Sequence, residues 1–305
     1  MELAVRHAVA LTAQDVAAKY APGDFAQFIE AFKWVTSLLR TPADYALITG
    51  RLAEQLLAQN VVYAEVTLSV GVMLLRKQDP LANYAEIRRA AAPFEARGLR
   101  LNWIFDAARQ FGVPAAMEVA KFAAECARHG VVAFGIGGDE LAFPAHDFVP
   151  VYEFARSAGL QPLIHAGETG DAQAVRDAIE MLGAVRIGHG IAAMHDARLM
   201  DELTKRGVVL EICPTSNLRT GALARQLGRP YANMEDHPLR RFFDAGVPVT
   251  LASDDPAMFG TSLLGEYQAA GQIGMNLAEL RRLVQMGFQR AFLEEIEKKK
   301  YNSLI

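Results

Sequence analysis

Residues 161–168, Gln161-Pro162-Leu163-Ile164-His165-Ala166-Gly167-Glu168, place a histidine and a glutamate directly behind a short apolar run. Such a run is typical of a buried strand, so the two polar groups stand at the exit of that strand. Two further apolar runs end in Ile187-Gly188-His189-Gly190 and in Ser253-Asp254-Asp255-Pro256. Three strand exits that carry histidines and paired aspartates predict one polar site at one end of a parallel sheet.

The chain alternates between helix and strand from about residue 41 onward. Thr41-Pro42-Ala43-Asp44 predicts a helix start, with Thr41 as the N-cap and Pro42 at the first helical position. Most later helices are followed by a glycine, which favours the left-handed backbone that ends a helix. The apolar runs between them are continuous, so we expect strands that are buried on both faces. We predict seven strands, at residues 61–66, 101–105, 131–135, 162–165, 185–188, 208–212 and 247–252.

Repeated β-α units favour either a (β/α)8 barrel or an open doubly wound sheet. All strand ends of a barrel converge on one face, so polar residues at several exits favour the barrel. A dinucleotide-binding sheet would carry Gly-x-Gly-x-x-Gly after its first strand, and the nearest match, residues 135–139, has a different spacing. Linkers and low-complexity tracts are missing from the sequence, so we predict a single domain over residues 1–305.

The composition narrows the class of protein. The 305 residues are 51% hydrophobic and carry a net charge of −4, which supplies a large core but no basic surface for nucleic acid or anionic membranes. Cys126 and Cys213 are too few for a disulfide framework, and no apolar run is long enough to span a membrane. We therefore expect a soluble, cytoplasmic protein that acts on a small molecule.

Five segments, taken together, resemble the motifs of the adenosine deaminase family of metal-dependent hydrolases. Any one of them alone would be weak evidence, but their order and spacing agree over essentially the whole chain. The form Cys213-Pro214-Thr215-Ser216-Asn217 looks like the bacterial branch of the family. The five segments are residues 135–140, 165–168, 187–190, 211–217 and 253–256.

The chain departs from the family pattern at its start. Family members carry a His-x-His pair at the end of the first barrel strand, and both histidines bind the metal. Here Leu3–His7 looks like the helix that follows that strand, and His7 is predicted to be a surface residue. The resemblance therefore implies an α/β fold, a (β/α)8 TIM-type barrel whose first strand is missing from this chain. The gap is expected between the strands at Val61 and Val247, and either the start is truncated or the metal site is lost.

The resemblance also implies which residues do the chemistry. His165 and Asp254 would bind one divalent ion, expected to be zinc, and two protein ligands predict weak binding. Glu168 would donate a proton to ring nitrogen N1 of a purine, for which burial and a neighbouring acid must keep it protonated near neutral pH. His189 would orient the metal-activated water and take its proton as the water attacks C6.

Two further residues would hold the purine. Gly138 would offer its backbone N–H to ring nitrogen N3, and Asp255 would bond to N7. The expected reaction is hydrolytic deamination of a 6-aminopurine nucleoside with release of ammonia. Adenosine and 6-amino-6-deoxyfutalosine are the candidate nucleosides, free adenine is a further option, and a homodimer is left open.

Each of these residues has an ordinary structural alternative. His165 can be a buried, hydrogen-bonded histidine, Glu168 a capping or ion-paired group, the two aspartates a helix start, and Gly138 a tight turn. Cys213 lacks the Pro-Cys-x-x-Cys context of cytidine-type zinc deaminases, so we expect it to pack. A rival function is a metal-free, catalytically inactive purine-binding protein, which would not need Glu168, His189 and Asp254 together. The histidines expected to be structural are His129, His146, His195 and His237.

Overall fold

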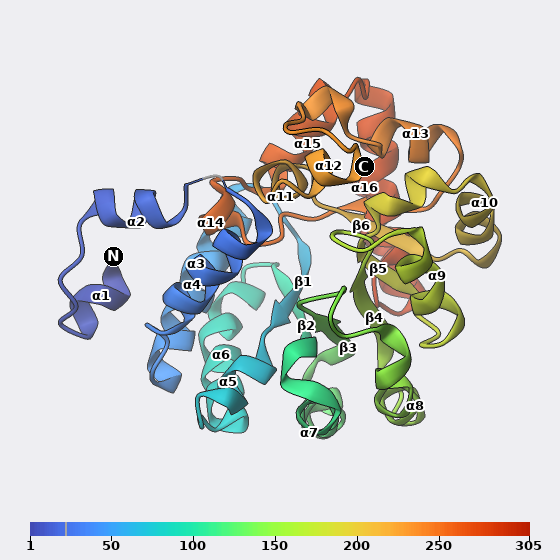
Figure 1. Ribbon diagram of the computed structural model, residues 1–305. Coiled ribbons are helices and arrows are strands. Elements are labelled where there is room, and N and C mark those ends of the chain that lie inside the picture. Colours follow the sequence, from blue (N-terminus) through green and yellow to red (C-terminus); the bar gives the residue numbers. More distant parts are fainter. Residues whose placement is uncertain (22) are drawn as a thin grey trace.

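The computed structural model describes residues 1–21 and 23–305. Its centre is a curled sheet of seven parallel strands in the order β1 to β7, so that neighbours in sequence are neighbours in space (Figure 1). The strands are β1 Tyr63–Leu68, β2 Arg100–Ala108, β3 Val131–Gly137, β4 Gln161–Ala166, β5 Arg186–His189, β6 Val209–Ile212 and β7 Val249–Leu251.

Helices flank the strands on the outside of the sheet (Figure 1). The α-helices are α1 Glu2–Arg6, α2 Ala13–Lys19, α3 Phe25–Thr36, α4 Pro42–Ala58, α5 Val70–Leu75, α6 Pro80–Glu95, α7 Gly112–Cys126, α8 Val149–Ser157, α9 Ala172–Glu180, α10 Ala197–Arg206, α11 Pro214–Arg219, α12 Ala222–Gln226, α13 Leu239–Asp244, α14 Pro256–Phe259, α15 Leu263–Gln272, α16 Leu277–Arg290 and α17 Glu295–Asn302. Short 3-10 helices lie at Arg109–Phe111, Ala127–His129, Ala145–Phe148, Ile191–His195 and Met234–Asp236.

The predicted fold class is confirmed. Seven parallel strands with surrounding helices form a TIM-type barrel that lacks one strand. In the part of the chain that the structure describes, β1 pairs only with β2 and β7 pairs only with β6. The gap therefore lies between β1 and β7, as the sequence predicted. We call this gap, bordered by Tyr63–Leu68 on one side and Val249–Leu251 on the other, the seam.

The first strand begins later than predicted because of how the preceding helix ends. Helix α4 starts at the predicted N-cap Thr41, where Thr41 and Asp44 form a reciprocal capping box. At its other end Asn60 takes a left-handed conformation (φ 58°), and the N–H of Val61 donates to the carbonyl oxygen of Leu56. This helix-ending pattern uses the backbone of residue 61, so β1 begins at Tyr63.

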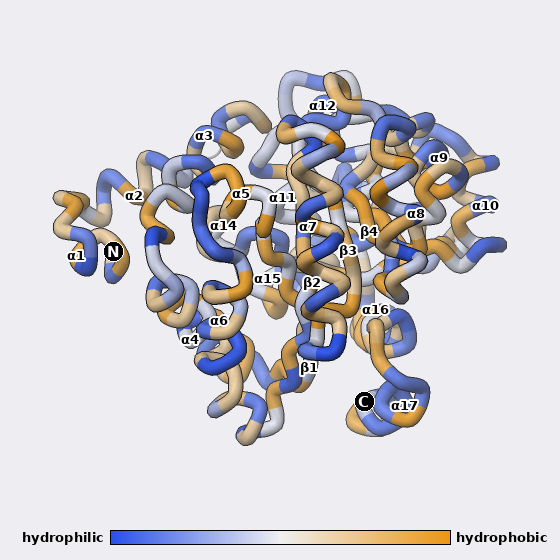
Figure 2. The backbone as a smooth tube through the Cα atoms, turned by 90° about the horizontal axis from the view of Figure 1, so that it is seen from below, coloured by the Kyte–Doolittle hydropathy of each residue, from blue (hydrophilic) through white to orange (hydrophobic). Residues whose placement is uncertain are grey.

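The core fills the space between the strands and the helices. One hydrophobic cluster extends from Tyr45 to Leu283, and Figure 2 shows apolar colouring along the central strands with mixed colouring along the helices. Large side chains such as Phe134 and Ile164 are fully buried, which stabilises the fold by about 1.5–3 kcal/mol for each such residue. None of the helices in residues 1–21 and 23–305 combines the length and the apolar character that a membrane span requires.

A buried ionic cluster ties the edge strand β1 to the other half of the barrel. The Arg186 guanidinium on β5 pairs with Glu65 on β1 and, at 2.9 Å, with Glu211 on β6. The ring of Phe292 lies 3.6 Å beneath the guanidinium, and the Phe292 N–H donates to Glu65. The buried Arg186 thus joins two carboxylates and a ring face from different segments, and the cluster holds β1 in place despite its open edge.

The expectation that His7 is a surface residue was wrong. Its side chain is only 12% exposed, because Nε2 lies 2.8 Å from a carboxylate oxygen of the fully buried Asp44. The same carboxylate accepts the backbone N–H groups of Arg40 and Thr41. His7 therefore anchors the end of α1 to the start of α4.

Candidate active site

All six residues predicted to form the site line one cavity of about 1800 Å³, which extends from the carboxyl ends of the strands into the barrel and along the seam. His165 lies on β4 and His189 is the last residue of β5. Glu168 follows β4, Gly138 follows β3, and the Asp254–Asp255 pair follows β7. The ends of parallel strands converge in a barrel, and this convergence brings together residues that are far apart in sequence.

Two of these residues have a backbone conformation that is uncommon for residues other than glycine. His189 (φ 63°) and Asp254 (φ 51°) both lie in the left-handed region. Such conformations cost free energy and persist where the surrounding structure holds them, often at functional sites. Here they turn each side chain from its strand into the cavity.

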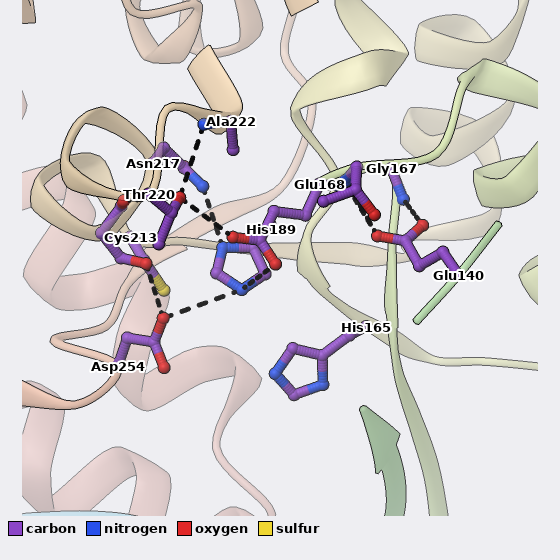
Figure 3. Close-up of polar contacts among 12 residues, drawn as sticks. Glu140, His165, Gly167, Glu168, His189, Cys213, Asn217, Thr220, Ala222 and Asp254 are labelled. Carbon is purple, nitrogen blue, oxygen red and sulfur yellow. Dashed lines mark hydrogen bonds and ion pairs between the residues drawn. The ribbon is translucent and has the colours of Figure 1, made fainter. Parts of the chain in front are cut away.

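The polar groups meet around the His189 ring, as Figure 3 shows. His189 Nε2 lies 3.5 Å from a Glu168 carboxylate oxygen and 3.8 Å from an Asp254 carboxylate oxygen. The His165 ring stands beside it, with 5.4 Å between the ring centroids. Gly188 makes this approach possible, because a Cβ atom there would lie 3.3 Å from the His165 ring. The structure therefore brings four of the six predicted site residues together in one cluster.

Gly138 and Asp255 line the same cavity. Gly138 has φ 99°, and a Cβ atom there would lie 2.2 Å from the amide oxygen of Gln110, so the position demands glycine. Asp255 is the N-cap residue of α14, and its side chain makes no cap hydrogen bond. Burial and the adjacent Asp254 raise the pKa of the Asp255 carboxyl well above its usual value.

The Glu168 carboxyl also has a raised pKa. Its side chain is buried, and this desolvation is the main cause that raises its pKa to about 8. The neighbouring charges of Asp254 and Glu140 raise the pKa further, while His165 acts in the opposite direction. A carboxylic acid that keeps its proton at neutral pH can act as a proton donor to a bound ligand.

The residues present fit a divalent metal ion. His165 has a buried ring nitrogen, Nδ1, without a hydrogen-bond partner in residues 1–21 and 23–305. Asp254 faces the same space, where one of its oxygens accepts the Ser216 hydroxyl at 2.7 Å. His189, Cys213 and Asp254 also bring one possible ligand atom each within 4.8 Å of one another. Imidazole and carboxylate donors suit zinc. Burial raises the pKa of the Cys213 thiol well above its usual value, and its sulfur lies 3.6 Å from the Glu211 carbonyl oxygen.

A buried carboxylate shapes the loop that carries Glu168. The side chain of Glu140 accepts three successive backbone N–H groups, those of Gly167 at 2.6 Å, Glu168 at 3.0 Å and Thr169 at 3.1 Å. From the other side, Gln226 donates to the carbonyl oxygens of Glu168 and Gly170. The loop is therefore held by its backbone, which leaves the Glu168 side chain free to face His189 (Figure 3).

A second set of polar contacts supports His189 from behind. The Asn217 side-chain nitrogen lies 3.0 Å from His189 Nδ1, and the Asn217 oxygen lies 3.2 Å from Nε2 of His237. Asn217 and His237 are both buried, at 0% and 3% exposed. His189 is thus enclosed by the cavity on one side and by an amide and a second imidazole on the other.

The sequence profile of one protein family, adenosine deaminase, matches the chain over residues 1–305. The chain belongs to the adenosine deaminase family. The family consists of hydrolytic deaminases, and the protein is an enzyme of this class.

Individual relatives agree with this assignment. An aminodeoxyfutalosine deaminase from Streptomyces coelicolor is 38% identical over 300 residues, which are 96% of this chain and 76% of the relative. An adenine deaminase from Rhizobium etli is 35% identical over 281 residues, which are 90% of this chain and 84% of the relative.

Solved structures show the same architecture. The crystal structure of an adenine deaminase from Arthrobacter aurescens superposes with a TM-score of 0.90 at 26% identity, covering 99% of this chain and 91% of that one. The fold is also that of an amidohydrolase with bound zinc from Burkholderia ambifaria, with a TM-score of 0.88 at 24% identity and coverage of 99% and 83%.

Sequence reasoning missed the residues that hold the site of this deaminase in place. Asn217 ends the motif Cys213–Asn217, from which no role for it follows, and His237 is one of the four histidines on or beside helices that are expected to be structural. Glu140 ended the segment 135–140 without a function of its own. The available signal was the presence of the polar residues Glu140 and Asn217 inside the family motifs, but their partners lie 20 to 29 residues away in sequence.

Proposed function

We propose that the enzyme removes the 6-amino group of an aminopurine nucleoside by hydrolysis. The observation that carries this proposal is the neutral Glu168 carboxyl, which faces the same cavity as His165, His189 and Asp254. The curated relatives support it, because they are named for deamination of aminodeoxyfutalosine and of adenine.

The purine is bound by donors that match its ring nitrogens. N1, N3 and N7 of an aminopurine are all hydrogen-bond acceptors. When it is protonated, the carboxyl of Asp255 can donate its O–H to N7, and the Gly138 backbone can donate its N–H to N3. Glu168 then faces N1 and transfers its proton there, which makes C6 more electrophilic. Proton donation by a positioned group of this kind accelerates reactions by roughly 10²–10⁴-fold.

A divalent ion is part of this proposal. His165 and Asp254 would hold it, and when bound it would supply Lewis-acid activation of the attacking water. The left-handed backbones of His189 and Asp254 fix both side chains toward that water. The strands and loops around the site keep the reacting groups in a buried pocket, where charges and dipoles act more strongly than in bulk water.

The lining of the cavity favours a substrate with an anionic substituent over a free base. The exposed guanidinium of Arg225 on α12 lines this cavity and suits an anionic substituent. Among the candidates, 6-amino-6-deoxyfutalosine is therefore our first choice and adenosine the second.

The test is ammonia release with zinc in excess. We expect kcat/KM to fall in the order 6-amino-6-deoxyfutalosine, adenosine, adenine, and we expect Arg225→Ala to lower it selectively for the first. A preference for free adenine would contradict the nucleoside assignment.

The rival function is purine binding without catalysis. It is favoured by one observation, that the described residues provide only His165 and Asp254 of the ligands expected from the family. In that case calorimetry would detect nucleoside binding while no substrate released ammonia at any zinc concentration.

A further inference from the structure

The hydrogen bonds behind His189 form a continuous chain that begins at a backbone donor. The N–H of Leu239 lies 3.1 Å from Nδ1 of His237, Nε2 of His237 lies 3.2 Å from the Asn217 oxygen, and the Asn217 nitrogen lies 3.0 Å from Nδ1 of His189. A backbone N–H is always a donor, whereas each imidazole and the amide can be arranged in either sense. The Leu239 N–H therefore decides which group donates and which accepts in every later hydrogen bond of this series.

The direction follows step by step. His237 Nδ1 must accept from Leu239, so the single proton of the neutral His237 ring is on Nε2 and is donated to the Asn217 oxygen. The Asn217 nitrogen then faces His189 and donates to Nδ1. A reversed amide would require a proton on His237 Nδ1, opposite the Leu239 N–H, and two donors would face each other in a buried site.

Charge and burial support a neutral His237. Its ring is buried, and this desolvation is the main cause that lowers its pKa to about 3, with His189 as a second cause. Asn217 is completely buried, so water cannot supply alternative partners at the amide.

We propose that His237 and Asn217 are positioning residues that fix His189 with its proton on Nε2, so that His189 acts as a hydrogen-bond donor in the cavity and not as a proton acceptor. Nε2 is the atom that faces Glu168 and Asp254. Nδ1 is occupied by the Asn217 amide, and a proton added there would again oppose two donors. This part of the inference depends only on the hydrogen-bond chain.

The consequence for catalysis rests on the proposed function. If His189 only donates, the proton of the attacking water needs another acceptor. Glu168 gives its proton to N1 of the purine and becomes a carboxylate that lies 3.5 Å from His189 Nε2. It can then take one proton from the attacking water, while His189 Nε2–H donates to the water oxygen. One proton moves from water to N1 in this sequence, and Glu168 ends as it began.

The direct test is the protonation pattern of the His189 ring. The chain has seven histidines, and the His189 signals in a ¹⁵N spectrum of histidine-labelled protein are those lost in His189→Gln. We expect Nε2 to show a directly bonded proton and Nδ1 to show the shift of an unprotonated nitrogen. A proton on Nδ1 in the unaltered protein would overturn the proposal, whatever the enzyme's activity.

Asn217→Asp reverses the polarity without changing the size of the side chain. A carboxylate accepts from both rings, so the His189 proton should move to Nδ1 and leave Nε2 without one. We expect kcat to fall by about 10²–10⁴-fold, as for a catalytic histidine held in the wrong tautomer, with KM and metal content little changed. Asn276→Asp, the same change at the exposed N-cap of α16, is the matched control and should leave the spectrum and kcat unaltered.

A second variant covers the case in which a buried carboxylate prevents folding. His237→Phe keeps a ring at this position but removes the anchor of the amide, so His189 should populate both tautomers and kcat should fall by about tenfold or more. Thermal melting by circular dichroism confirms folding of each variant. Retention of a single Nε2–H tautomer in a folded His237→Phe protein would show that the chain does not set it. If the unaltered protein shows the expected Nε2–H signal of His189 but releases no ammonia, the result would instead count against the proposed function.

Discussion

Glu168 shows most directly how local environment changes the chemistry of a single residue. A solvent-exposed glutamate is ionised at pH 7, but burial together with Asp254 and Glu140 raises the pKa of Glu168 to about 8. The residue can therefore keep a proton at neutral pH and donate it to a bound ligand. The same side chain on the protein surface would have no such ability.

We predict that Glu168→Gln lowers kcat by at least about a hundredfold, because the amide keeps the size and a hydrogen bond but cannot transfer a proton. Metal content should be unchanged, because Glu168 is not among the expected ligands. His165→Ala should lower metal content and activity together. Steady-state kinetics with elemental analysis of each variant checks this, and near-normal kcat or loss of metal in Glu168→Gln would refute the assigned role.

At the same scale, the sequence predicted which residues meet but not how they are held. His165, Glu168, His189 and Asp254 each follow an apolar run, and a parallel barrel has to bring such ends together. The orientation of the His189 ring could not be predicted, since it depends on Asn217 and His237 and on one backbone N–H at Leu239. The contacts of Asn217 with His189 and with His237 have no local pattern, because they join residues 28 and 20 positions apart in the sequence.

At the scale of elements, the loop between β4 and α9 depends on one carboxylate. Glu140 accepts three consecutive N–H groups, which form a concave donor site of the kind that binds anions. The loop would otherwise leave these donors buried and unsatisfied.

We predict that Glu140→Gln destabilises the protein by about 1–3 kcal/mol, because the amide turns a donor toward backbone N–H groups. The displaced loop should also lower kcat more than it raises KM, since Glu168 is carried on it. Urea unfolding and kinetics measure the two effects. Glu153→Gln, the same change on the exposed face of α8, should leave stability and kcat unchanged. An equal effect of both variants would argue against the role of Glu140 in holding the loop.

The junction of α1 and α4 should respond to acid. Burial alone would raise the pKa of Asp44, but hydrogen bonds from the backbone of Arg40 and Thr41, with those from the Thr41 hydroxyl and His7, lower it from 3.8 to about 2. A lowered pKa stabilises the folded state above the unfolded value of 3.8, and this stabilisation is lost as the pH falls through about 2.

We therefore predict that Asp44→Asn lowers the free energy of unfolding at neutral pH by roughly 1 kcal/mol, after allowance for solvent screening. The difference from the unaltered protein should shrink as the pH falls from 4 toward 2. Chemical unfolding over this pH range measures it. A difference that is constant or grows with acid would show that the carboxylate is not the cause.

At the scale of the whole molecule, the main feature of the barrel is the seam, the gap between β1 and β7. The repeated β-α pattern and the family motifs predicted seven strands and the position of the gap, because each strand is a strong local signal. The brace of Glu65, Arg186 and Phe292 across the barrel could not be predicted, since three charged or aromatic residues from distant segments have no common pattern. It explains how β1 keeps its place with one strand neighbour.

We predict that the chain of 305 residues binds less than one equivalent of zinc after dialysis, because catalytic zinc sites are held by about three protein ligands and only His165 and Asp254 are expected here. Elemental analysis gives the ratio directly. A full equivalent that survives in Cys213→Ser but not in His165→Ala would mean that His189 or another residue completes the site. A full equivalent lost in Cys213→Ser would assign the thiol as a ligand.

The left-handed backbones of His189 and Asp254 have a consequence for substitution at these two positions. Glycine would relax the backbone at both, but it would leave the buried Asn217 amide without His189 and the Ser216 hydroxyl without Asp254. Alanine would lose the same contacts and would keep the strained backbone. Glycine should therefore be tolerated better than alanine at each position.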